Sequence, residues 1–143
     1  MNKMNDLSLT VNRRINQPAR KIFEAWLNPE MMAKYMIPDD GFTVPHCEID
    51  ARVGGRFSFI VRRDKDNPHA GTYLVIDRYS RIEFTWESPF AAQGSVVTLT
   101  FTPVEDGVTD VELTHVKFLS EQSRDGHKRV WGQILATVET LVG

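Results

Sequence analysis

The side chains of this sequence best suited to chemistry near neutral pH are its histidines, because an imidazole can gain or lose a proton in that range. There are four of them, His46, His69, His115 and His127. No two are four residues apart on an expected helix, and Cys47, which follows His46 directly, would point to the opposite face of a strand. Because a zinc site needs three or four converging ligands, the sequence predicts neither a metal centre nor a cofactor.

His115 is the histidine with the most suggestive position. It lies in the middle of the run LTHVKF and has the same strand parity as Val111 and Leu113, so it shares their apolar face. Two interpretations stay open. The imidazole is either a hydrogen-bonded side chain of the sheet face, or a polar group in a pocket that orients a ligand or moves a proton.

Carboxylates and hydroxyls give little support for an enzyme. Glu48 and Asp50 share a strand face with His46, and two nearby carboxylates can divide acid and base roles when their environments differ. Solvated strand faces explain them more simply, and no serine has the Gly-x-Ser-x-Gly context of a nucleophile elbow. The weak catalytic candidates are His115, Tyr73 and Glu48, so the sequence leaves catalysis open while favouring a protein that is not an enzyme.

The run RVGGRFSF, residues 52–59, contains a pair of glycines. A phosphate-binding loop needs such glycines between a strand and the N-terminus of a helix. A strand-like run follows instead, so we interpret the glycine pair as a turn that leads into a strand. Strand alternation then predicts that Phe57 and Phe59 point inward, while Arg56 and Ser58 face outward.

The overall composition fits an ordinary globular domain. The chain has 143 residues, 41% hydrophobic and 25% charged, and no apolar run approaches the roughly 20 residues of a membrane-spanning helix. Its 17 basic and 19 acidic residues are scattered, with a net charge of -2, so nucleic acid is not an expected partner. The start of the chain lacks the pattern of a secretory signal and Cys47 is the single cysteine, so we expect a cytoplasmic protein.

Hydrophobic periodicity predicts about seven strands and three helices. Period-two alternation marks strands near 7–15, 43–51, 56–62, 71–79, 81–87, 95–104 and 108–118. Two short helices are expected after Pro18 and Asn28, and a long one from about Glu121. The polar residues 63–68 are expected to link two strands, and Asp106-Gly107 is typical of a tight hairpin.

These elements favour an α+β fold in which about six or seven antiparallel strands form one curved sheet. One face of that sheet is apolar and must be covered, and the terminal helix is the only element long enough to lie across it. A sheet that curves around a helix leaves a hollow between the two, and concave apolar hollows are where small molecules bind.

Five motifs, in this order, resemble those of one known family. They are IFEAWLNPEMMAKYM at 22–36, CEIDARVGGRFSF at 47–59, GTYLVIDRYSRIEFTW at 71–86, VTLTFTPVEDGVTDVELTHVKF at 97–118, and the helix around Trp131. The chain is similar to the START-like, birch-pollen-allergen-like superfamily called SRPBCC, and within it to the group named after the activator of heat-shock protein 90 ATPase. The resemblance implies a single domain over 1–143 with a helix-grip fold, whose sheet wraps the C-terminal helix around an apolar pocket.

The resemblance also implies several functions, which stay as alternatives. The first is that a soluble domain binds a hydrophobic or amphipathic small molecule, such as a lipid, between sheet and helix. The second is a cyclase- or hydrolase-like enzyme whose pocket uses histidine, tyrosine and glutamate. The third is a co-chaperone-type module that stimulates a heat-shock ATPase in the stress response. No membrane partner is expected, and the protein is expected to be a monomer or a homodimer.

The residues expected to line the pocket are large apolar side chains and aromatic side chains with a polar tip. Two positions depart from the pattern of the group: Tyr35-Met36 stands where two tryptophans are usual, and Val130-Trp131 where a Gly-Trp pair is usual. The predicted ligand-binding residues are Tyr35, Met36, Phe57, Phe59, Tyr73, Trp86, His115 and Trp131.

Overall fold

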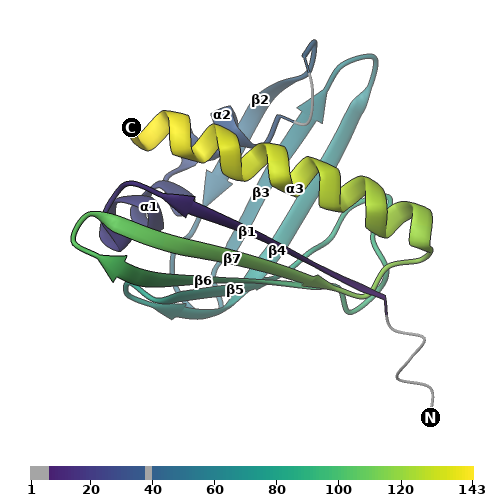
Figure 1. Ribbon diagram of the computed structural model, residues 1–143. Coiled ribbons are helices and arrows are strands. Elements are labelled where there is room, and N and C mark those ends of the chain that lie inside the picture. Colours follow the sequence, from purple (N-terminus) through teal and green to yellow (C-terminus); the bar gives the residue numbers. More distant parts are fainter. Residues whose placement is uncertain (1–6, 38–39) are drawn as a thin grey trace.

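The structure is a computed structural model that describes residues 7–37 and 40–143. Within those residues the chain forms seven strands and three helices (Figure 1). In chain order they are β1 (Ser8–Ile15), α1 (Ala19–Trp26), α2 (Pro29–Tyr35), β2 (Thr43–Ile49), β3 (Arg56–Arg62), β4 (Asp66–Asp77), β5 (Arg81–Thr85), β6 (Val96–Glu105), β7 (Val108–Val116) and α3 (Glu121–Val142). Neighbouring strands all pair antiparallel, in the order β1-β7-β6-β5-β4-β3-β2.

The sheet curves around α3, which crosses its concave face (Figure 1). The two short helices α1 and α2 connect β1, at one edge of the sheet, to β2 at the other. The core between sheet and helices is apolar, and its largest fully buried side chains include Trp131, Phe23 and Phe101. This is the helix-grip arrangement that the sequence predicts, with the two short helices after the first strand.

Local sequence signals set where the helices begin. The Asn28 side chain accepts a hydrogen bond from the backbone N–H of Glu30 at 2.9 Å, and Pro29 stands at the first position of α2, where an N–H has no intrahelical partner. At the start of α3, Ser120 Oγ accepts from the backbone N–H of Ser123 at 3.1 Å. These caps satisfy donors that the first turn of a helix leaves without partners.

Residues 63–65 link the antiparallel strands β3 and β4 as expected, but the predicted link of residues 63–68 is too long, because β4 already begins at Asp66. Pro68 therefore lies inside β4, where it pairs with β3. The N–H of Ala70, two residues on, points away from β3 and donates to the carbonyl of Glu87 at 2.9 Å. By strand parity the Pro68 nitrogen also points away from β3, so the proline removes no hydrogen bond from the β3–β4 ladder.

The glycine pair forms the turn that the sequence predicts. Gly54 has a φ of 85°, which glycine adopts at no steric cost. Gly54 N–H donates to the carbonyl of Tyr73 at 2.8 Å, and Tyr73 N–H donates to the carbonyl of Gly55 at 2.9 Å. Strand β3 follows this turn directly. Its Phe57 and Phe59 are only 2% and 1% exposed, which confirms their predicted inward direction.

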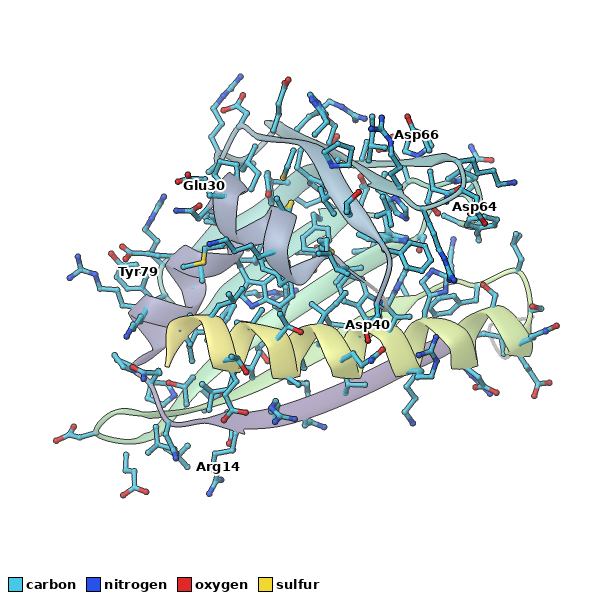
Figure 2. The ribbon with its side chains drawn as sticks, turned by 90° about the horizontal axis from the view of Figure 1, so that it is seen from above. Arg14, Glu30, Asp40, Asp64, Asp66 and Tyr79 are labelled. Carbon is cyan, nitrogen blue, oxygen red and sulfur yellow. The ribbon has the colours of Figure 1, made fainter. Side chains whose placement is uncertain are left out.

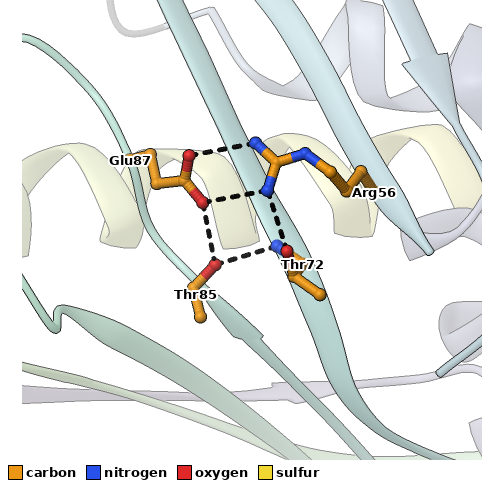
Figure 3. Close-up of polar contacts among 4 residues, drawn as sticks. All are labelled: Arg56, Thr72, Thr85 and Glu87. Atoms are coloured by element: carbon orange, nitrogen blue, oxygen red, sulfur yellow. Dashed lines mark hydrogen bonds and ion pairs between the residues drawn. The ribbon is translucent and has the colours of Figure 1, made fainter. Parts of the chain in front are cut away.

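On the outer face of the sheet, four side chains tie β3, β4 and the end of β5 together (Figure 3). The guanidinium of Arg56 donates to Thr72 Oγ1 at 2.9 Å and to the two carboxylate oxygens of Glu87 at 3.0 and 3.3 Å. Thr85 Oγ1 accepts from the backbone N–H of Thr72 at 2.8 Å and donates to Glu87 at 3.2 Å. This polar network holds the strands beside the register irregularity between β4 and β5.

Several charged side chains point away from the space between α3 and the sheet. Figure 2 shows this for Arg14, Glu30, Asp64 and Asp66, which project outward around the molecule. Arg14 is also paired with Asp110 of β7, with a nitrogen–oxygen distance of 2.7 Å. In the described part of the chain, no helix is long and apolar enough to cross a membrane.

Candidate functional site

A cavity of about 710 Å³ lies between strands β3 and β4 and the N-terminal half of α3. Its lining includes Phe59 and Val61 from β3, His69 from β4, and His127 and Trp131 from α3. The inward side of each strand supplies every second residue to this wall, and the helix supplies residues three or four apart. A concave volume of this size with mostly apolar walls and a few polar groups is typical of small-molecule sites.

The rim of the cavity carries exposed apolar side chains. Phe90, in the loop after β5, and Leu119, just before α3, both line the cavity and are 56% and 70% exposed. Gly126 lines it from α3, and a Cβ atom added there would meet nothing within 4 Å. The absent side chain at this position therefore leaves room beside the helix.

Aromatic rings form the inner wall of the cavity. The ring of His69 stacks flat on Phe59, with centroids 4.8 Å apart and an interplanar angle of 5°. Trp86 lies next to both His69 and Trp131, with centroid distances of 5.3 and 5.1 Å. Because each ring is held by two or more others, the wall is a rigid surface rather than a set of independent side chains.

His115 is fully buried and holds two hydrogen bonds. The indole Nε1 of Trp131 donates to its Nδ1 at 3.0 Å, and its Nε2 lies 2.6 Å from Ser95 Oγ. An indole N–H can only donate, so Nδ1 must be the unprotonated nitrogen, and Nε2 carries the hydrogen and donates to Ser95. Burial, with a smaller contribution from nearby His127, lowers the pKa of His115 to about 3. His115 therefore positions Trp131 as a neutral imidazole.

The structure divides the eight predicted ligand-binding residues into two groups. Met36, Phe59, Trp86 and Trp131 line the cavity. The other four are buried in the core without being part of this lining: Tyr35, Phe57, Tyr73 and His115. Of these, Tyr35 donates its hydroxyl to the carbonyl of Trp26 at 2.8 Å. Phe57 packs beside Phe59 on the same face of β3, with centroids 6.2 Å apart, so it supports this ring of the wall.

The three weak catalytic candidates do not form a shared site. Glu48 is exposed on β2, on the face opposite the core. Its Oε2 lies 3.4 Å from Nε2 of His46. His115 points to the inner face and already has two partners. Burial raises the pKa of Tyr73 far above its usual value, so its hydroxyl keeps its proton. Proton transfer among these three groups has no support in the geometry.

Two polar residues of the cavity, His69 and His127, were not among the predicted site residues. His69 lies between the expected polar link at 63–68 and the strand expected near 71–79, so neither predicted element includes it. His127 does carry a signal: it lies four residues before Trp131 and so shares its side of the helix. Helical periodicity applied to polar residues as well as apolar ones would have placed it in the cavity.

No group of three or more histidine, cysteine, aspartate or glutamate side chains is placed to hold a metal ion within residues 7–37 and 40–143. Cys47 is a free, half-buried thiol on β2. Burial, with a smaller contribution from Glu48, raises its pKa to about 11, so the thiol keeps its proton at neutral pH.

Comparison with known proteins identifies relatives of the whole fold. The family described as Activator of Hsp90 ATPase homolog 1-like protein matches residues 16–143. No curated protein matches the chain significantly. Among solved structures, a protein from Chromobacterium violaceum has a TM-score of 0.85 at 24% identity, covering 94% of this chain and 96% of the other.

Two further solved structures carry names that refer to the family or to its activity. The AHSA1-like protein from Aeromonas hydrophila has a TM-score of 0.81 at 21% identity, covering 95% of this chain and 92% of the other. An HSP90 activator from Plasmodium falciparum has a TM-score of 0.74 at 21% identity, covering 96% of each chain. The TM-scores show that these structures share the overall fold of this chain, and the family match extends over most of the sequence. This chain belongs to the family of Activator of Hsp90 ATPase homolog 1-like proteins, within the SRPBCC superfamily.

Proposed function

We propose that this protein binds a hydrophobic or amphipathic small molecule in the cavity between α3 and the sheet. The observation that carries the proposal is the cavity of about 710 Å³ itself, with Phe59, Trp86 and Trp131 in its wall. Exposed Phe90 and Leu119 at the rim continue the apolar surface outward. Binding of an apolar ligand to a concave apolar surface that is open to solvent is favourable, because it removes apolar area from water.

The free energy gained by burying apolar surface limits how tightly a ligand can bind. Burial of apolar surface is worth about 25 cal/mol per Å², so a ligand that hides ~300 Å² gains about 7 kcal/mol before the cost of its own ordering. Such a ligand would have a dissociation constant of about 10 μM before that cost is subtracted, and one in the millimolar range after a cost of about 4 kcal/mol is subtracted. A rigid ring system loses less freedom than a long alkyl chain, so we expect it to bind more tightly for the same buried area.

A direct test uses the tryptophans of the cavity wall as reporters. Titration with naphthalene derivatives or steroids is expected to change the fluorescence of Trp86 and Trp131 saturably and to raise the melting temperature by mass action. Isothermal titration calorimetry should give a negative heat-capacity change, the mark of apolar burial. A complete lack of stabilisation by any apolar compound at its solubility limit would rule the proposal out.

Gly126→Leu is expected to weaken ligand binding at least tenfold while the fold remains stable. The new side chain has open space at its Cβ and extends into the cavity, where it competes with the ligand. Leucine also has a helix propensity better than that of glycine by about 1 kcal/mol. Dissociation constants from the fluorescence titration and unfolding midpoints in urea measure the two effects.

Gly132→Leu is the matched control, because it makes the same exchange at a position of α3 that does not line the cavity. A Cβ at Gly132 likewise meets nothing within 4 Å. We expect it to leave the dissociation constant unchanged. Equal weakening by both substitutions would show that the helix, and not the cavity volume, governs binding.

A heat-shock ATPase is a second candidate partner. The support for it is the description of the matched family and the likeness to the HSP90 activator of Plasmodium falciparum. Stimulation of the ATPase rate of a purified heat-shock protein 90 by this protein is the test. An unchanged rate at saturating concentration, together with no binding in a pull-down, would exclude this role.

A further inference from the structure

The tautomer of His69 is fixed by its own strand. Its Nδ1 lies 3.1 Å from the backbone carbonyl oxygen of Asn67, and a carbonyl can only accept a hydrogen bond. Nδ1 therefore carries the hydrogen, and Nε2 of the neutral ring is left with a lone pair. Burial lowers the pKa of His69 to about 4, so the ring is neutral at pH 7 and its Nε2 is an acceptor.

His127 is held in the same way by its own helix. Its Nδ1 lies 2.8 Å from the carbonyl oxygen of Ser123, four residues earlier in α3. In the neutral ring, Nε2 is again the acceptor. The ring is further fixed by a tilted contact with Phe118 and an edge-on contact with His115, with centroid distances of 5.1 and 5.5 Å.

Both imidazoles line the cavity, one from the sheet and one from the helix. Across residues 7–37 and 40–143, no side chain or backbone group hydrogen-bonds to Nε2 of either ring. The cavity wall thus offers hydrogen-bond acceptors whose direction is set in advance. A preorganised acceptor favours ligands that bring a donor, because the donor then loses no partner when it leaves water.

We propose that the cavity selects a rigid apolar ligand that carries a hydroxyl group, such as a phenol or a polycyclic alcohol, whose O–H donates to Nε2 of His69. His127 offers the second acceptor for a ligand with a further donor. This inference rests on the proposed function and adds the chemical class of the ligand to it.

Two other occupants fit these residues less well. A carboxylate has no hydrogen to donate at neutral pH, and its oxygens would face the lone pairs of the imidazoles. A metal ion also binds histidine Nε2 when Nδ1–H is held by a carbonyl, but it needs a third ligand, and the described residues supply no such cluster. A neutral hydroxyl supplies the hydrogen-bond donor that these acceptors match.

The experiment compares three probes that share one ring system. They are 2-naphthol, which has a donor, 2-methoxynaphthalene, which has none, and 2-naphthoate, which has a negative charge. Calorimetry at pH 7.5 on the full chain is expected to show 2-naphthol binding about fivefold tighter than the methyl ether, the effect of one typical hydrogen bond. The carboxylate is expected to bind weakest.

Substitution at the imidazole separates this inference from the proposed function. His69→Phe keeps a flat aromatic ring at this position and removes the acceptor, so 2-naphthol and the methyl ether should bind with about equal affinity. His46→Phe, on exposed β2 outside the cavity, should keep the preference. Circular dichroism confirms that each variant is folded.

Four results would overturn the inference, and each has a different consequence. Equal affinities of 2-naphthol and its methyl ether for the unaltered protein would remove the hydroxyl selectivity while the cavity stands as a binding site. Tighter binding of 2-naphthoate would assign the site to anions. If zinc stabilises the unaltered protein but not His69→Phe, the acceptors are metal ligands. Failure of all three probes to bind would remove the proposed function and this inference together.

Discussion

Gly71→Ala is expected to destabilise the fold by about 3 kcal/mol, because the added methyl group would overlap the backbone of the next strand. An ideal Cβ at Gly71 would lie less than 3.0 Å from the carbonyl oxygen of Thr85 and from the ring of Phe57. The carbonyl belongs to the strand backbone and cannot turn aside. Relief would require moving both β5 and the Phe57 ring, which packs edge-on against Phe84 with centroids 5.2 Å apart. Urea unfolding at neutral pH measures the loss.

A Gly→Ala substitution in α3 is the control, because it is expected to raise the stability of the fold rather than lower it. Gly132→Ala in α3 adds a methyl group with nothing within 4 Å and improves helix propensity, so we expect it to stabilise the protein by about 1 kcal/mol. If Gly71→Ala unfolds at the same urea concentration as the unaltered protein, the close approach of β4 and β5 at this point is not a constraint on the fold.

The requirement for glycine at position 71 is also a feature that the sequence alone does not predict. Period-two alternation was enough to place Phe57 and Phe59 inside, and Asp106-Gly107 was enough to predict the β6–β7 hairpin, whose Gly107 has a φ of 74°. Both signals are local to the chain. The need for glycine at 71 arises from Thr85, on another strand, and no local pattern reveals it.

The candidate site was predictable to a similar extent and for the same reason. Trp131 and Trp86 lie on the apolar faces of their elements, and both line the cavity. The role of His115 was left open because a strand face does not show which partners lie across it. Its partners, Ser95 and Trp131, are 20 and 16 residues away in the sequence. The pairing of β6 with β7 brings Ser95 to His115, and the packing of the long helix on the sheet brings Trp131 there.

The stability of the fold is expected to fall by roughly 4 kcal/mol between pH 7.5 and pH 5, because one buried and one partly buried histidine must stay neutral. The pKa values of His115 and His69 are lowered from 6.5 to about 3 and about 4. The folded state binds these protons only below its lowered pKa values, whereas the unfolded chain binds them from about pH 6.5 downward. Stability is therefore complete above pH 6.5 and decreases as the pH falls. Each histidine contributes about 2 kcal/mol to the loss at pH 5.

The range from pH 7.5 to pH 5 separates the titration of the histidines from that of the acidic side chains. Salt-bridged Asp66, Glu87 and Asp110 have pKa values lowered by hydrogen bonds from their arginine partners, so they stay ionised in the folded state throughout the range from pH 7.5 to 5. Urea unfolding at half-unit steps of pH gives the free energy of unfolding directly. A free energy that is constant across this range would show that neither imidazole is held neutral by burial.

Single substitutions then assign the pH dependence to each ring. His115→Asn keeps an acceptor for the indole N–H of Trp131 and has no proton to gain, so it should remove about half of the slope. His69→Asn should remove the other half, and the double variant should show almost none. The physical cause is the same for both rings: a proton added to His115 would meet the N–H of Trp131, and one added to His69 would carry a charge into the aromatic wall against Phe59. If His115→Asn is less stable at every pH but keeps the full slope, the buried imidazole is a packing element and the titrating group lies elsewhere.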